Sequence, residues 1–137
     1  MKKISISFFV FLCVCLTAQS QLVTGENVAV TNTNAGKVRG YINNAIFTYK
    51  GIPYAEAKRF EAPQKTKSWQ GIRSSLSYGP VAPLMDPTTS VQDEGEFVFH
   101  HDWGFTNENC LMVNVWTPGI NDGKKRPVLF WIHGGGF

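Results

Sequence analysis

The stretch Pro127-Val-Leu-Phe-Trp-Ile-His-Gly-Gly-Gly-Phe137 joins an apolar run to three consecutive glycines. Residues 128–132 have no polar break, which is typical of a strand buried on both faces of a parallel sheet. Glycine allows positive φ and close approach of the backbone to a ligand, so Gly134, Gly135 and Gly136 would follow that strand as bare backbone. Backbone N–H groups at the end of a buried strand can donate hydrogen bonds to an atom on which negative charge develops. We therefore expect a buried strand that ends in an anion-stabilising loop.

The N-terminus has the pattern of a secretory signal. Two lysines precede the mainly apolar residues 4–16, and Ala18 and Ser20 place small side chains at −3 and −1 of a cleavage before Gln21. The alternative is a membrane anchor, but the stretch is shorter than the ~20 apolar residues that span a bilayer. We expect residues 1–20 to be a signal peptide and the rest to be exported, either secreted or periplasmic, with no stable membrane span.

Loss of this leader changes the charge and the cysteine content. The sequence has 13 basic and 10 acidic residues. Without the two leader lysines the balance is 11 to 10, a net charge of +1, and no basic cluster suggests a nucleic-acid partner. Bulky residues before Cys13 and Cys15 disfavour a lipoprotein signal as a third reading of the leader. After cleavage Cys110 remains alone and has no internal disulfide partner.

Short strands and turns dominate the middle of the sequence. Residues 37–42 and 45–50 are predicted strands around an Asn43-Asn44 turn, which indicates a hairpin. The segment Gly51-Ile-Pro-Tyr-Ala55 is expected to end the second strand, because proline cannot donate to a β-ladder. Residues 55–87 show no sustained period and should wrap irregularly, with Trp69 and Tyr78 as anchors.

Residues 111–117 form the next predicted strand, after a loop-like stretch from 86 to 109. A short link with turn residues then leads to residues 128–132. This link implies a reversal of direction without showing that the two strands are neighbours. Helix signals are almost absent, so the helices that cover an α/β sheet would lie beyond residue 137. Without the helices needed to bury residues 128–132, we expect this chain alone to be poorly folded or prone to aggregation.

Three sequence blocks occur in an order that resembles the type-B carboxylesterase/lipase family, which includes the cholinesterases. The first runs from Gly36 to Trp69 and contains Gly51-Ile-Pro-Tyr-Ala55. The second is Glu108-Asn-Cys-Leu-Met-Val-Asn-Val115, the most specific of the three. The third, His133-Gly-Gly-Gly-Phe137, resembles the oxyanion loop of lipases and esterases. Hormone-sensitive-lipase-like esterases share the third block, but the second argues against that relative.

This resemblance implies an α/β-hydrolase fold. Residues 21–137 would be its N-terminal β-rich part, with the hairpin, the wrapping loops and the first strands of the central sheet up to the oxyanion loop. The implied activity is that of a serine esterase, which hydrolyses a small carboxylic ester through an acyl-enzyme without cofactor or metal. The nucleophile motif G-x-S-x-G does not occur in the 137 residues, so this fragment alone is expected to be inactive. The alternative is a non-catalytic binding or adhesion domain of the same family.

The resemblance also implies roles for the glycines. Gly135 and Gly136 would supply the N–H groups that point at the oxyanion, and Gly134 would let the turn form. Removal of one such donor typically lowers the rate by about 10²–10³. A glycine turn without chemistry is the alternative. His133 matches a structural position rather than the catalytic base. Residues 100–102, His-His-Asp, lack the spacing of metal ligands, so no metal site is expected.

Four further positions follow from the family pattern. Arg59 and Glu108 match an ion pair that ties the wrapping segment to the second block; the alternative is two separately solvated charges. Asn109 stands where the family usually has Asp. Ala82 stands where cholinesterase-like members have the cysteine that pairs with Cys110. We therefore expect Cys110 to be a free, buried thiol.

Overall fold

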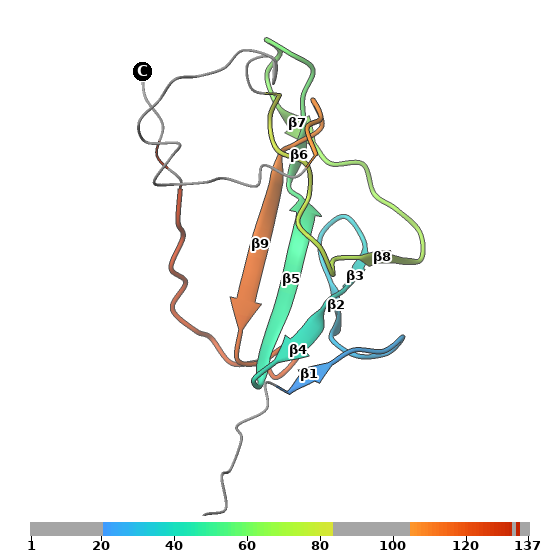
Figure 1. Cartoon of the computed structure of the whole chain (residues 1–137), viewed down its shortest axis with the longest axis vertical. Helices are drawn as coiled ribbons and strands as arrows, with labels where there is room; N and C mark the ends of the chain where they lie inside the picture. Colours follow the sequence, from blue (N-terminus) through green and yellow to red (C-terminus); the bar gives the residue numbers. More distant parts are fainter. Residues whose placement is uncertain (1–20, 84–104, 133, 135–137) are drawn as a thin grey trace, which may run out of the picture.

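The computed structural model describes residues 21–83, 105–132 and 134 (Figure 1). All regular secondary structure in these ranges is β. The strands are β1 (Leu22–Val23), β2 (Val30–Asn32), β3 (Lys37–Arg39), β4 (Tyr41–Asn43), β5 (Ile46–Pro53), β6 (Ala55–Glu56), β7 (Gln64–Lys65), β8 (Ile72–Ser74) and β9 (Met112–Thr117). They form sheets with the orders β1-β4-β5-β9, β2-β3-β8 and β6-β7. Within the same ranges no helix is long and apolar enough to cross a membrane.

The predicted hairpin is confirmed as the pair β4–β5. The two strands are antiparallel, and Tyr41 lies opposite Thr48. The turn residues are Asn44 and Ala45, with φ of 49° and 64°, so the predicted Asn43-Asn44 turn was wrong by one residue. Two successive positive φ angles are typical of a primed turn, whose twist matches that of the strands it joins.

The predicted single strand over residues 37–42 is wrong, because the chain changes sheets at Gly40. β3 pairs with β2 and β8, whereas β4 pairs with β1 and β5. A Cβ on Gly40 would overlap the backbone oxygen of Thr48 and would lie 2.7 Å from the Tyr49 ring. Only glycine lets the chain pass so close to β5, and this contact joins the two sheets.

The segment Gly51-Ile-Pro-Tyr-Ala55 ends the second hairpin strand, as predicted, but the strand continues to Pro53 and does not stop at residue 50. β5 runs through Gly51, whose φ of 65° accompanies a register shift between Tyr49 and Ile52. This β-bulge absorbs the irregular residue without ending the strand. Pro53 is the last paired residue of β5 and lies opposite Met112. At a strand end its missing N–H removes little from the ladder.

The predicted strand over residues 111–117 is confirmed as β9, which runs antiparallel to β5 (Figure 1). β9 therefore joins residues far apart in the sequence: Phe47 lies opposite Thr117, and Tyr49 lies opposite Val115. This pairing places the second sequence block beside the first. It also sets the point from which the chain continues toward the glycine loop.

The core lies on one side of this sheet and includes Val38 and Tyr49, both almost fully buried, together with Ala29. Trp69 packs against this cluster, and its Nε1 donates a hydrogen bond to the backbone oxygen of Lys37 at 2.9 Å. The predicted anchoring role of Trp69 is thus confirmed. Partly buried residues complete the cluster: Val28, Ile42, Phe47, Ile52 and Ile120.

The wrapping segment contains more order than the sequence indicated. β6 and β7 pair with each other, and β8 adds to β3 in parallel. These strands have two or three residues, too few for an alternating pattern to show. Tyr78 remains exposed, and the ammonium nitrogen of Lys50 lies 4.0 Å from the centre of its ring. Its anchoring contact is therefore a surface cation–π interaction.

Residues 128–132 do not form the predicted buried strand. Their side chains are 70–93% exposed, and they belong to no sheet in the described part of the chain. Figure 1 shows the chain turning back after the end of β9 and continuing as an irregular trace that contains this segment. A buried strand needs neighbours on its edges and cover on its faces, and the described ranges supply neither.

Candidate active-site loop

Most of the predicted loop lies outside the described residues. His133, Gly135 and Gly136 are not among them, and neither is the His-His-Asp sequence of residues 100–102. Gly134 is described and exposed, and a Cβ placed on it meets no atom within 4 Å. Packing against the described residues therefore does not require a glycine at position 134. No group of three or more His, Cys, Asp or Glu side chains that could hold a metal occurs in the described ranges.

The segment between β9 and the loop is held at its start by a local network. The hydroxyl of Thr117 donates to the backbone oxygen of Gly119 at 3.0 Å. Asp122 and Arg126 form an ion pair, and Asp122 also accepts a bond from the backbone N–H of Lys124 at 3.1 Å. The Arg126 hydrogen bond, helped by that backbone bond, lowers the pKa of Asp122 to about 2. The carboxylate is thus ionised at neutral pH.

The same segment is docked onto β2. Asn121 donates from Nδ2 to the backbone oxygen of Val30 at 3.4 Å and accepts from the hydroxyl of Thr31 at 3.1 Å. Ile120 packs against the core. Because of these contacts, the direction in which the chain leaves toward Pro127 is set by β2 and β9 together.

The predicted ion pair between Arg59 and Glu108 is confirmed. Their side chains are 58% and 53% exposed, so the pair lies in water at the surface. Exposed pairs of this kind contribute about 0–1 kcal/mol to stability. The pair ties the wrapping segment to the residues before β9 without burying charge.

The second sequence block contains a contact that the sequence analysis did not predict. The side-chain oxygen of Asn114 accepts a hydrogen bond from the backbone N–H of Gly51 at 2.9 Å. The only available signal was an uncharged polar residue inside an otherwise apolar strand. Cys110 is a free thiol, as predicted, but it is half-buried rather than buried. The backbone N–H of Asn109 donates to Asn107 Oδ1 at 2.9 Å.

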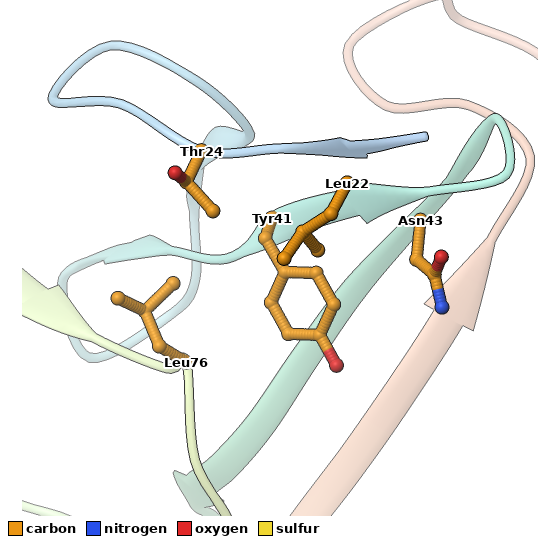
Figure 2. Close-up of a pocket in the computed structure, with 5 residues that line it drawn as sticks. All are labelled: Leu22, Thr24, Tyr41, Asn43 and Leu76. Carbon is orange, nitrogen blue, oxygen red and sulfur yellow. The ribbon is translucent and has the colours of Figure 1, made fainter. Parts of the chain in front are cut away.

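A separate hollow of about 340 Å³ lies on the surface near β1 and β4. Figure 2 shows its lining side chains, which come from β1, β4 and the segments that follow β1 and β8. They are Leu22, Thr24, Tyr41, Asn43 and Leu76. None is charged, and none is a predicted site residue.

Comparison with known proteins agrees with the order of the three sequence blocks. The profile of the carboxylesterase family matches residues 27–137. Phenmedipham hydrolase from Pseudarthrobacter oxydans is 38% identical over 113 residues, which cover 78% of this chain and 22% of that protein. Para-nitrobenzyl esterase from Bacillus subtilis is 33% identical over 112 residues, which cover 79% and 21%.

Solved structures give the same result for the fold. An esterase from Clostridium hathewayi, described as able to hydrolyse aliphatic aromatic polyesters, is similar with a TM-score of 0.72 and 38% identity. The match covers 85% of this chain and 22% of that one. The predicted fold class, the β-rich part of an α/β-hydrolase, is confirmed. The chain spans about a fifth of the length of these relatives, and it belongs to the carboxylesterase family.

Proposed function

We propose that this chain supplies the oxyanion-stabilising loop of a serine carboxylic ester hydrolase. The observation that carries the proposal is the family match, which runs to residue 137 and so includes the glycine triplet after the apolar run. Relatives named as a hydrolase and an esterase support the same chemistry. The substrate would be a small carboxylic ester, and no cofactor is needed.

In the proposed reaction a serine attacks the ester carbonyl carbon while a histidine takes the serine proton. The carbonyl oxygen becomes negative, and the backbone N–H groups of Gly135 and Gly136 donate hydrogen bonds to it. Collapse of this intermediate releases the alcohol and leaves an acyl-enzyme, which water hydrolyses to the acid. The 137 residues contain no G-x-S-x-G motif, so the serine would come from a further segment of a longer chain.

Export belongs to the same proposal. The basic, apolar and small-residue pattern of residues 1–20 supports a cleaved leader. β1 begins at Leu22, so cleavage before Gln21 would leave every described strand intact. The N-terminal sequence of the protein recovered from the medium or periplasm of an exporting host should start at Gln21. A product that retains Met1 in the cell membrane would contradict this part of the proposal.

The test of activity begins with the gene. Its reading frame is sequenced past the codon of Phe137, and the whole encoded protein is assayed with p-nitrophenyl butyrate and a fluorophosphonate label. We expect turnover, one labelled serine in a G-x-S-x-G motif, and neither result with the 137 residues alone. A stop codon directly after Phe137 would defeat the proposal for this polypeptide. A folded whole protein without turnover or label would favour the binding or adhesion domain.

The glycine donors are then tested in the whole protein. Gly136→Pro removes one N–H, and we expect kcat to fall by about 10²–10³ while KM changes little. The thermal midpoint of Gly136→Pro, compared with that of the parent protein, reports any general damage to folding. Unchanged kcat in folded Gly136→Pro would remove Gly136 from the oxyanion site.

A further inference from the structure

Gln21, which would be the first residue after cleavage of the leader, is held on the turn of the β4–β5 hairpin. Its backbone oxygen accepts a hydrogen bond from the N–H of Asn44 at 3.2 Å. Its own backbone nitrogen donates to the side-chain oxygen of Asn44, also at 3.2 Å. The next residue, Leu22, lies opposite Asn43 in the ladder between β1 and β4. The mature terminus would therefore be a fixed end of the sheet and not a loose tail.

Cleavage before Gln21 would leave an α-amino group beside the side-chain amide of the same residue. At neutral pH part of such amino groups is uncharged, and this form can attack the side-chain carbonyl carbon Cδ to close a five-membered ring. The N–Cδ bond forms and the Cδ–Nε2 bond breaks. The departing amide nitrogen takes a proton from the amine and leaves as ammonia. Two groups held within one residue react far faster than the same groups on separate molecules, and the step needs no other reactant.

We propose that Gln21 closes to a pyroglutamyl residue, which forms the modified N-terminus of the exported protein. The lactam nitrogen keeps one hydrogen, so it can still donate to Asn44 Oδ1, while the positive charge of the ammonium is lost. The bond from the Asn44 N–H to the backbone oxygen of Gln21 involves none of the reacting atoms. The hairpin turn therefore accepts the modified terminus without loss of either hydrogen bond.

The side chain of Asn44 suits a neutral lactam. Its oxygen is an uncharged acceptor, whereas a carboxylate at this place would favour the charged ammonium over the attacking amine. Closure of the ring also removes the free α-amino group that aminopeptidases require. The lactam would therefore protect β1, which has only two residues, from digestion at its exposed end.

This inference rests on the proposed export, so two preparations separate the failure of one from the failure of the other. The whole encoded protein is first recovered from an exporting host, and its intact mass is measured. We expect a chain that begins at Gln21, is lighter by one ammonia, and resists N-terminal sequencing until pyroglutamyl aminopeptidase removes the first residue. In the second preparation a protease that cuts directly before Gln21 releases the same protein from a fusion in vitro, and the loss of ammonia is followed with time.

Three variants of the protein released from the fusion test the role of each residue. Gln21→Ala has no side-chain amide, so its mass should stay constant and leucine aminopeptidase should trim it. Asn44→Asp should slow the loss of ammonia by about three- to tenfold, because the carboxylate stabilises the ammonium. Asparagine and aspartate both tolerate the positive φ at this position. Asn32→Asp is the matched control, because it makes the same change on β2 in another sheet, and it should leave the rate nearly unchanged.

Three results would count against the proposal. A chain that is cut before Gln21 but keeps its ammonia in both preparations would overturn the modification and leave export standing. A retained leader would overturn export, and with it the modification in the cell. Equal rates for Asn44→Asp and Asn32→Asp would show that Asn44 does not act on the terminus.

Discussion

The side-chain oxygen of Asn114 accepts a hydrogen bond from the backbone N–H of Gly51 at 2.9 Å. Gly51 is buried and lies in the β-bulge where the register between β5 and β9 shifts. A bulge leaves a backbone donor without a partner in the ladder, and an unpaired buried donor is costly. Asn114 lies on the partner strand and supplies the missing acceptor. The bulged residue and the side chain that satisfies its N–H therefore come from two different sequence blocks.

Replacement of Asn114 should therefore destabilise the bulge. Asn114→Ala should lower the free energy of unfolding by about 1–3 kcal/mol, because the N–H of Gly51 loses its partner. Asn114→Asp keeps an acceptor oxygen and should lose less. The control is Asn32→Ala, at an exposed asparagine of β2. Urea unfolding gives the values, and equal losses for Asn114→Ala and Asn32→Ala would contradict the assigned role.

Gly40 should tolerate no side chain. In Gly40→Ala the new Cβ overlaps the backbone oxygen of Thr48, and backbone cannot move aside as a flexible side chain can. We expect a loss of at least about 2 kcal/mol. Gly123→Ala is the control: its Cβ meets no atom within 4 Å, but its φ is +67°, so a loss of about 1 kcal/mol is expected from backbone strain alone. Urea unfolding gives both free energies. A larger loss for Gly123→Ala than for Gly40→Ala would show that close contact with β5 is not the reason for glycine at position 40.

The hairpin turn should be improved by glycine. Ala45 has a φ of 64°, and glycine adopts positive φ without the Cβ clash that alanine suffers. Ala45→Gly should raise the free energy of unfolding by about 0.5–1 kcal/mol, even though glycine gains entropy in the unfolded chain. Ala62→Gly is the control at an exposed alanine without positive φ, and it should be neutral or destabilising. A lower thermal midpoint for Ala45→Gly would show that the turn does not strain alanine.

The ion pair between Asp122 and Arg126 should make stability depend on pH. The pKa of Asp122 is lowered from 3.8 to about 2 in the folded chain. A carboxyl whose folded pKa is depressed stabilises the fold above its unfolded pKa, and that contribution is lost as pH falls from about 4 to about 2. Arg126→Gln should therefore lower stability at pH 7 but not near pH 2. Lys125→Gln is the control, because it also removes one positive charge but lies outside the ion pair.

Nuclear magnetic resonance titration of the Asp122 carboxyl gives a direct reading of this pair. In the parent chain the midpoint should lie near 2, and in Arg126→Gln it should move toward the ordinary value for Asp. Lys125→Gln should leave the midpoint in place. An unchanged midpoint in Arg126→Gln would mean that the arginine is not the main cause of the lowered pKa.

Local chemistry was enough to predict several elements from the sequence. The β4–β5 hairpin follows from two β-rich runs around turn residues, and β9 follows from a compact run of strand-forming residues. Trp69 was identified as an anchor because a large aromatic residue in a polar segment needs a packing site. The free Cys110 follows from Ala82 at the position of a family cysteine. These features depend on neighbouring residues or on the family pattern, so no knowledge of the tertiary structure was needed.

Tertiary contacts decided the remaining features. The chain changes sheets at Gly40 because β5 passes too close for a side chain, and β5 continues beyond Gly51 because Asn114, 63 positions away, accepts the freed N–H. The need for distant partners also explains why residues 128–132 do not form the buried strand that their sequence predicts. Their apolar sequence specifies that they need burial, but a strand is buried only when distant residues supply its neighbours and its cover. The sequence alone determined the β4–β5 hairpin and β9, whereas the tertiary structure determined the short strands of the wrapping segment and which apolar runs have partners.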